Sequence, residues 1–218
     1  MSDLGQQGLF DITRTLLQQP DLGALSDALT RLVRQSALAD SAAIVLWHSG
    51  THRASYYSTR DNGKTFEYED ETYLAHGPVR RILSRPEVLH CNFAEFRQAW
   101  PKLAESDLYQ PFGHYCMLPL AAEGQIFGGC EFIRTTDQPW SEAEYERLHT
   151  FTQIVAVVAE QIQSRVTNNV DYDLLSRHAK PFVGYSDITA LHTVLNRHTG
   201  LVSFHGAMLN ADLLGGKL

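Results

Sequence analysis

The segment Phe182–His192 has the residue types of a hydrolase nucleophile turn. It reads FVGYSDITALH, with a short apolar run, Gly184, and Ser186 two positions later. A catalytic serine on such a turn follows the pattern G-x-S-x-G, and here the last position is Ile188. Ser186 suits the N-cap of a helix over residues 187–197 better, with Asp187 in its first turn. The segment therefore predicts no catalytic serine.

Five soft or borderline metal donors occur in the middle of the chain: His90, Cys91, His114, Cys116 and Cys130. A hairpin with its turn at residues 123–124 would place Cys116 opposite Glu131, and the thiols of Cys116 and Cys130 would face opposite sides of the sheet. A register one residue different would bring both thiols to one side, and the two registers remain open. Buried cysteine usually serves as a small hydrophobic residue. We expect no metal and no cofactor, with Cys91, Cys116 and Cys130 as weak metal candidates.

The elements that would position these residues begin with two amphipathic helices. Leu9–Leu17 follows helical spacing up to Pro20, and Leu22–Val33 continues it. Two strands, Ser41–Trp47 and Arg53–Ser58, come next and would pair across a short turn. The sequence DNGK at residues 61–64 then indicates a loop.

The middle and the end of the chain supply the remaining elements. Residues 77–84 suit a short helix, residues 87–91 a brief strand, and Asn92 a helix N-cap. Strands over 115–122 and 126–134 would form a second hairpin, in which Pro119 must lie at an edge or with its nitrogen away from a ladder partner. Ser141 and Glu144 form a capping box that begins a helix of roughly twenty-five residues.

This order predicts an α+β fold, in which an antiparallel sheet is sandwiched by helices and long helices lie at both ends. The apolar stripe of the last helix, residues 148–166, is longer than a sheet beneath it can cover. Its far end at Val158, Ile162 and Val166 should pack on a second helix, and Leu9–Leu17 offers one. In a symmetric pair the same surfaces would meet twice, so we expect a homodimer through the terminal helices.

Composition excludes several classes of function. The chain has 218 residues, a formal net charge of −7 and three cysteines. An acidic balance argues against direct binding of nucleic acid. The sequence has neither an apolar run of membrane-spanning length nor a secretory signal. Three cysteines without a C-x-x-C pair fit reduced thiols, so we expect a cytoplasmic protein that contacts no membrane.

Residues 1–175 resemble a known family. The segment CMLPLAAEGQIFGGCEFIR, followed by PWSEAEYERLHTFTQIVAVVAEQI, is similar to the closing half of a GAF sensor domain. Together with MSDLGQQGLFDITRTLLQQPDL, YEDETYLAHGPVRRILSRP and EQIQSRVTNNVDYDLL, it resembles the N-terminal part of the formate hydrogenlyase transcriptional activators of enteric bacteria. The resemblance implies a non-catalytic sensory domain that responds to formate. In that family the sensor controls an ATPase, and a separate domain binds DNA. This sequence lacks both a G-x-x-x-x-G-K-[ST] loop and a basic helix-turn-helix.

The same resemblance places a small-ligand pocket between the sheet and the middle helices. Formate is a small anion, so its site needs one or two cationic or N–H donors in a dry cavity. The polar groups near the expected pocket wall are His76, Arg80, Arg81, His90 and His114. Arginines on a short helix are more often solvated, and His114 at a strand start is equally compatible with a packed core residue.

Residues 176–218 resemble a different family. The segment KPFVGYSDITALHTVLNRHTGLVSFHGAML is similar to an internal part of the murein LD-carboxypeptidases, serine peptidases that need Ser, Glu and His together. In that family these three residues lie outside the corresponding segment. We expect a GAF-like sensor over 1–175 and, over 176–218, a short α/β fragment that is no independent domain, joined near residues 176–179. The alternative function is a remnant of such a peptidase without its catalytic triad.

Overall fold

The chain begins with two helices, as the sequence predicts. The computed structural model describes residues 6–48, 53–59, 65–69, 77–105, 109–122, 124–168, 172–177, 182–184, 195–197 and 199–205. Helix α1 covers Gln6–Leu17 and helix α2 covers Leu22–Gln35. Asp21 caps α2, because its side chain accepts a hydrogen bond of 2.8 Å from the backbone N–H of Ala24.

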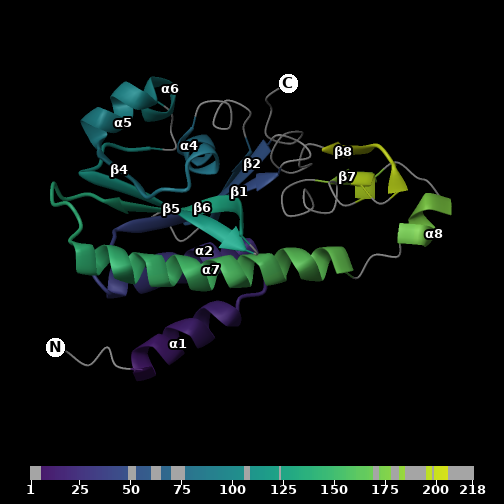
Figure 1. Ribbon diagram of the computed structural model, residues 1–218, viewed down its shortest axis with the longest axis horizontal. Coiled ribbons are helices and arrows are strands. Elements are labelled where there is room, and N and C mark those ends of the chain that lie inside the picture. Colours follow the sequence, from purple (N-terminus) through teal and green to yellow (C-terminus); the bar gives the residue numbers. More distant parts are fainter. Residues whose placement is uncertain are drawn as a thin grey trace.

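A six-stranded antiparallel sheet forms the centre of the molecule (Figure 1). Its strands are β1 (Ser41–His48), β2 (Arg53–Thr59), β3 (Thr65–Glu69), β4 (Leu89–Asn92), β5 (His114–Ala122) and β6 (Gln125–Arg134). They lie in the order β3-β2-β1-β6-β5-β4, and both predicted hairpins are present. Strand β3 was not expected from the sequence. This strand of five residues follows a loop-like sequence and is defined by its pairing with β2.

Helices cover both faces of the sheet, which confirms the predicted α+β sandwich. Helix α7 (Glu142–Asn168) packs on β5, and α2 packs on β1 and β2. We call this side the α7 face. On the other side lie three short helices, α4 (Pro78–Ser84), α5 (Phe93–Ala99) and α6 (Pro101–Ala104), which we call the α4 face. A separate hydrophobic cluster fills the space on each side. The central strands β1, β5 and β6 alternate their side chains between the two clusters.

The long helix α7 begins with the predicted capping box. The backbone N–H of Ser141 donates to Glu144 Oε2 at 2.8 Å, and the backbone N–H of Glu144 approaches Ser141 Oγ at 3.4 Å. Farther along, Val158 and Ile162 are 2% and 5% exposed. They belong to the cluster on the α7 face, where α1 and α2 both contact α7. The second helix expected for this stripe therefore comes from the same chain.

Pro119 lies in β5 beyond the end of β4, which pairs only with residues 114–117 of β5. β5 is therefore an edge strand at this position, as the proline requires. The neighbouring hairpin carries a register shift between Leu120 and Ala121, a β-bulge that follows the proline.

The last part of the chain forms helix α8 (Tyr172–Arg177) and two strands, β7 (Phe182–Gly184) and β8 (Ser203–His205). The strands pair in parallel, as in α/β proteins. Ser186 and most of the predicted helix over 187–197 lie outside the described residues, and residues 195–197 are helical. In the part of the chain that the structure describes, no helix has the length and apolar character needed to cross a membrane.

Candidate functional site

A buried carboxylate lies at the centre of the α4 face. Glu131 is 1% exposed, although it sits in the middle of the apolar strand β6. Its neighbours Cys130 and Phe132 belong to the cluster on the α7 face, so the alternation of the strand turns Glu131 to the opposite side. A carboxylate in such a place is very costly unless hydrogen bonds compensate for the lost water.

Tyrosine hydroxyl groups provide this compensation. The hydroxyl of Tyr115 donates to Glu131 Oε1 at 2.7 Å, and the hydroxyl of Tyr109 lies 2.9 and 3.1 Å from the two carboxylate oxygens. Tyr56 on β2 is the third phenol at this site. Burial raises the pKa of Tyr56 well above its ordinary value, and the negative charge of Glu131 and a hydrogen bond to it raise it further. Together, Glu131, Tyr56, Tyr109 and Tyr115 form what we call the carboxylate cluster.

Aromatic rings surround this cluster and keep it dry. Phe96 of α5 is fully buried, and its ring centroid lies 4.8 Å from that of Tyr109 and 5.1 Å from that of Tyr115. Phe112 and Trp100 pack on Phe96 at 5.3 and 5.1 Å. Hydrogen bonds in such an apolar layer are electrostatically stronger than in water, so the carboxylate is held firmly.

Of the predicted ligand residues, Arg80 and Arg81 come together on α4. Both side chains are exposed, and both line an open hollow of about 360 Å³ with Trp100, which lies between α5 and α6. Trp100 packs on Phe96, which in turn packs on Tyr115. The hollow is thus connected to the carboxylate cluster by two aromatic contacts.

The two described histidines of the predicted set lie on the opposite side of the sheet. His90 on β4 pairs with Cys116, and its ring centroid is 6.0 Å from that of Tyr145 on α7. His114 lies 6.5 Å from the ring of Trp140, and its Nε2 is 3.3 Å from Asp137 Oδ1. The structure therefore separates these histidines from Arg80 and Arg81. His76 lies outside the described residues.

The structure decides the register that the sequence left open for the cysteines. Cys116 pairs with Phe132 and Cys130 with Leu118, so both thiols face α7, while Cys91 belongs to the α4 face. Cys116 and Cys130 are fully buried, and burial raises their thiol pKa values. Burial also raises the pKa of Cys91 to about 12. Such thiols stay protonated and act as small hydrophobic residues. Among the described residues, no group of three or more His, Cys, Asp or Glu side chains is placed to hold a metal ion.

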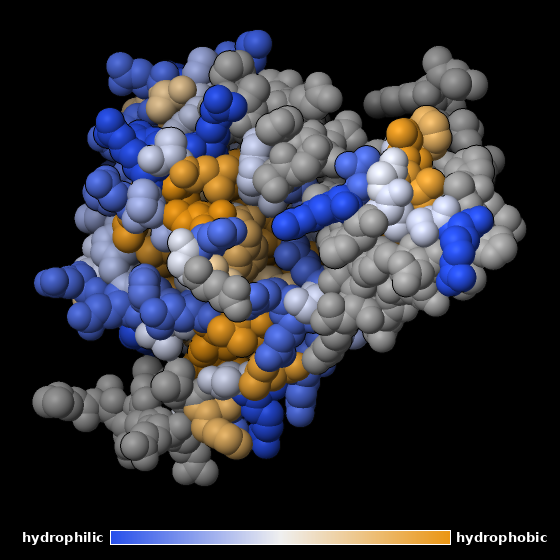
Figure 2. All heavy atoms as spheres, turned by 45° about the vertical axis from the view of Figure 1, so that its right-hand side comes forward, coloured by the Kyte–Doolittle hydropathy of each residue, from blue (hydrophilic) through white to orange (hydrophobic). Residues whose placement is uncertain are grey.

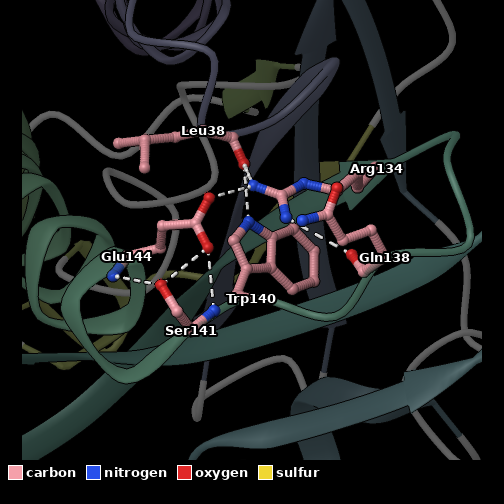
Figure 3. A network of polar contacts seen from close by, with 6 residues as sticks. All are labelled: Leu38, Arg134, Gln138, Trp140, Ser141 and Glu144. Atoms are coloured by element: carbon pink, nitrogen blue, oxygen red, sulfur yellow. Dashed lines mark hydrogen bonds and ion pairs between the residues drawn. The ribbon is translucent and has the colours of Figure 1, made fainter.

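A second polar network connects the end of β6 to the start of α7 (Figure 3). Arg134, 7% exposed, forms an ion pair of 2.7 Å with Glu144 and donates to the carbonyl oxygen of Leu38 at 3.0 Å. Trp140 Nε1 donates to the same carbonyl oxygen, and the Arg134 guanidinium lies 4.9 Å from the Trp140 ring centroid. These contacts fix the first turn of α7 against the corner between α2 and β1.

Sequence reasoning missed the carboxylate cluster. One signal was present, because an acidic residue interrupts an otherwise apolar strand in IFGGCEFIR. The partners gave no comparable signal. Tyr56 is far along the chain from Tyr109 and Tyr115, and tyrosines are common in any core. The pairing of β2 with β1, of β1 with β6 and of β6 with β5 brings Tyr56 and Tyr115 to Glu131, and Tyr109 comes from the segment that precedes β5.

The fold and this interior site define the class of protein. The sequence profile described as "GAF domain" matches residues 21–161, and the chain belongs to the GAF domain family. It is a regulatory sensing module. Within that class, the chain is 75% identical over 182 residues to the formate hydrogenlyase transcriptional activator of Salmonella typhimurium strain LT2. It is 68% identical over 182 residues to that of Escherichia coli strain K12. Each match covers 84% of this chain and 26% of the activator, so the chain spans about a quarter of the length of these relatives.

Solved structures support the fold alone. The GAF domain of an Acinetobacter phosphoenolpyruvate-protein phosphotransferase superposes with a TM-score of 0.60 at 16% identity, covering 78% of this chain and all of that domain. The GAF domain of the corresponding Coxiella burnetii protein gives a TM-score of 0.56 at 16% identity, covering 75% and 96% of the two chains.

The last part of the chain matches another family. The profile described as "LD-carboxypeptidase N-terminal domain" covers residues 149–206. A probable murein peptide carboxypeptidase of Bacillus subtilis strain 168 is 51% identical over 49 residues, which are 22% of this chain and 15% of that protein. The predicted resemblance to murein LD-carboxypeptidases is confirmed as a local match.

Proposed function

We propose that this chain is the formate-sensing module of a bacterial transcriptional activator, and that it has no catalytic activity of its own. The observation that carries the proposal is its 75% identity over 182 residues to an activator of formate hydrogenlyase. The interior of the α4 face supports it. Three short helices cover a dry layer with a few precisely placed polar groups, which is the usual composition of a small-molecule site.

Arg80 and Arg81 are the proposed cationic contacts for formate. A guanidinium matches the two oxygens of a carboxylate and forms stronger hydrogen bonds than a neutral donor. Both arginines line the hollow beside Trp100, so a small anion bound there would lie next to the aromatic layer. His76, His90 and His114 remain in the proposed set, with His90 and His114 on the α7 face.

Titration calorimetry with sodium formate tests this function, with sodium chloride as the control salt. Formate should bind the native protein, and Arg80→Ala or Arg81→Ala should weaken binding by about 1.5–3 kcal/mol, the value of a charge-assisted hydrogen bond. Arg97→Ala, at an exposed position of α5 outside this hollow, is the matched control. Failure of the native protein to bind formate would contradict the function. Unchanged affinity in both arginine variants would remove these residues from the site.

We also propose that the module forms a homodimer through its terminal helices. Apolar side chains remain at the surface of these helices: Phe10 is 65%, Leu17 41% and Val157 52% exposed. Figure 2 shows orange apolar atoms at the surface between blue hydrophilic ones. A parallel pair of such helices would carry a signal toward whatever part of the protein follows.

The second candidate is a peptidase remnant, which the local match over residues 149–206 favours. We propose that only residues 176–218 are an appendage of the sensor, because the first part of the match lies in α7, which belongs to the sensor core. Incubation of the purified chain with a murein tetrapeptide tests the alternative. Release of the terminal D-amino acid would contradict a purely regulatory role.

A further inference from the structure

The carboxylate cluster has the chemistry of a binding site for a small carboxylate. Two phenol hydroxyls, of Tyr109 and Tyr115, converge on one carboxylate at 2.7–3.1 Å, and Tyr56 adds a third phenol. The carboxylate belongs to the chain itself, since it is the end of the Glu131 side chain. A formate ion has the same two oxygens on one carbon and needs the same donors.

We propose that Glu131 is an internal stand-in for the ligand, and that formate binds by displacing its carboxylate from the hydroxyls of Tyr109 and Tyr115. The inference rests on the proposed formate-sensing function and places the ligand's final position inside the α4 face. Formate would meet Arg80 and Arg81 at the surface hollow and reach the tyrosines past Trp100 and Phe96.

The surrounding structure favours displacement of this kind. The layer that covers the cluster consists of helices of 7, 7 and 4 residues. Short helices of this length depend on tertiary packing for their stability, so a local loss of that packing would open the layer. Formate has three heavy atoms, and a local opening of the aromatic layer is enough to admit it.

Displacement of the Glu131 carboxylate would also transmit a change from the site to α7. Glu131 and Arg134 lie three residues apart on β6 and face opposite sides of the sheet. Arg134 holds the first turn of α7 through Glu144 and Gln138. A change in the hydrogen bonds of Glu131 would therefore act on β6, the strand whose end fixes α7.

If Glu131 and formate compete for the same hydroxyls, two variants should change the formate affinity in opposite directions. Tyr115→Phe removes a donor that formate needs, so formate affinity should fall about tenfold. Glu131→Gln replaces the competing anion by a neutral and weaker acceptor, so formate affinity should rise about tenfold. Tyr145→Phe, on α7 at the other face, should leave the affinity unchanged.

Calorimetry on the full chain tests these three variants, with thermal melting as the check on folding. Glu131→Ala provides a second measurement that does not depend on native affinity. It removes the carboxylate to which Tyr109 and Tyr115 hydrogen-bond, so formate should raise its melting temperature or restore its refolding, and sodium chloride should not. The inference is overturned if formate binds the native protein with an affinity that Tyr115→Phe and Glu131→Gln both leave unchanged. It is also overturned if formate has no effect on Glu131→Ala. Absence of formate binding by the native protein would contradict the proposed function and with it the displacement of Glu131, and rescue of Glu131→Ala would then show only that the tyrosine hydroxyls accept a small carboxylate.

Discussion

At the scale of single residues, the two charged side chains buried in β6 are the most informative. Glu131 and Arg134 are 1% and 7% exposed, and each is surrounded by groups that neutralise or hydrogen-bond it. Because strand side chains alternate, three positions along one strand separate a carboxylate on the α4 face from a guanidinium on the α7 face. Each is therefore stabilised by partners on its own side of the sheet.

Glu144, the partner of Arg134, should make stability depend on acid pH. A hydrogen bond from the Ser141 backbone N–H, followed by the contacts with Arg134, lowers its pKa from 4.5 to about 2, although partial burial acts in the opposite direction. A depressed pKa contributes stability that is complete above the unfolded value and is lost as pH falls through the folded one. The difference in unfolding free energy between the native protein and Glu144→Gln should therefore shrink from about pH 5 toward pH 2. Urea unfolding across this range measures it, with the exposed Glu146→Gln as control; a constant difference would contradict the assignment.

Two adjacent glycines of β6 should differ sharply in their tolerance of a side chain. A Cβ at Gly128 would lie 2.1 Å from the carbonyl oxygen of Val45 on β1, whereas the atoms nearest to a Cβ at Gly129 belong to the flexible Met117 side chain, at 3.0 Å. Gly128→Ala should lower the unfolding free energy by about 2 kcal/mol or more, because the β1–β6 pairing must shift. Gly129→Ala should cost about 1 kcal/mol or less. Equal melting temperatures for the two variants would show that the strands are not this close.

At the scale of elements, α7 presents a buried and an exposed side at neighbouring positions. Val158 is 2% exposed within the cluster that α1, α2 and the sheet share, and Val157 is 52% exposed. The apolar stripe is thus mostly core of one chain, and the proposed dimer has to use the outer side of the helices. Substitutions at Val158 and Val157 should therefore separate an effect on folding from an effect on association.

Val158→Glu should destabilise the fold by several kcal/mol, because it buries an unpaired carboxylate. Val157→Glu should leave the melting temperature nearly unchanged and shift a dimer toward monomer in sedimentation at tens of micromolar. Val157→Ala, which adds no charge, is the control. A native protein that already sediments as a monomer would contradict the dimer. An unchanged melting temperature of Val158→Glu would contradict the packing of α7.

At the scale of the whole molecule, we expect the sensor to fold without the last part of the chain. The two hydrophobic clusters draw on residues up to Ile162, and in the described residues the extensive contacts of β7 and β8 are with each other. In the described residues, β7 and β8 of the peptidase-like part form a parallel pair that is separate from the six-stranded sheet.

Removal of residues 179–218 should accordingly leave the melting temperature within a few degrees of the full chain. Formate affinity should also stay the same, because no residue of the proposed site lies in that region. Differential scanning calorimetry and formate titration of the truncated and full chains measure both quantities. A loss of the cooperative transition on truncation would show that the tail is part of the sensor core.

The sequence by itself determined the local elements. Helical spacing, the capping box at Ser141, the cap at Asn92 and the two hairpins are all encoded within short windows, and each was predicted close to its observed bounds. Similarity to known families likewise identified a GAF sensor and a peptidase-like tail from short motifs. These features depend on residues a few positions apart, where backbone propensity and capping act directly.

Only the tertiary structure decided which side chains meet. The bulge between Leu120 and Ala121 set the register that turned Cys116 and Cys130 to one face, and strand pairing placed His90 and His114 on the side away from Arg80 and Arg81. The same pairing brought Tyr56, Tyr109 and Tyr115 around Glu131. A shift of one residue moves every side chain of a strand to the other face, and such shifts depend on contacts between distant segments. For that reason the elements could be predicted from local sequence, while the carboxylate cluster could not.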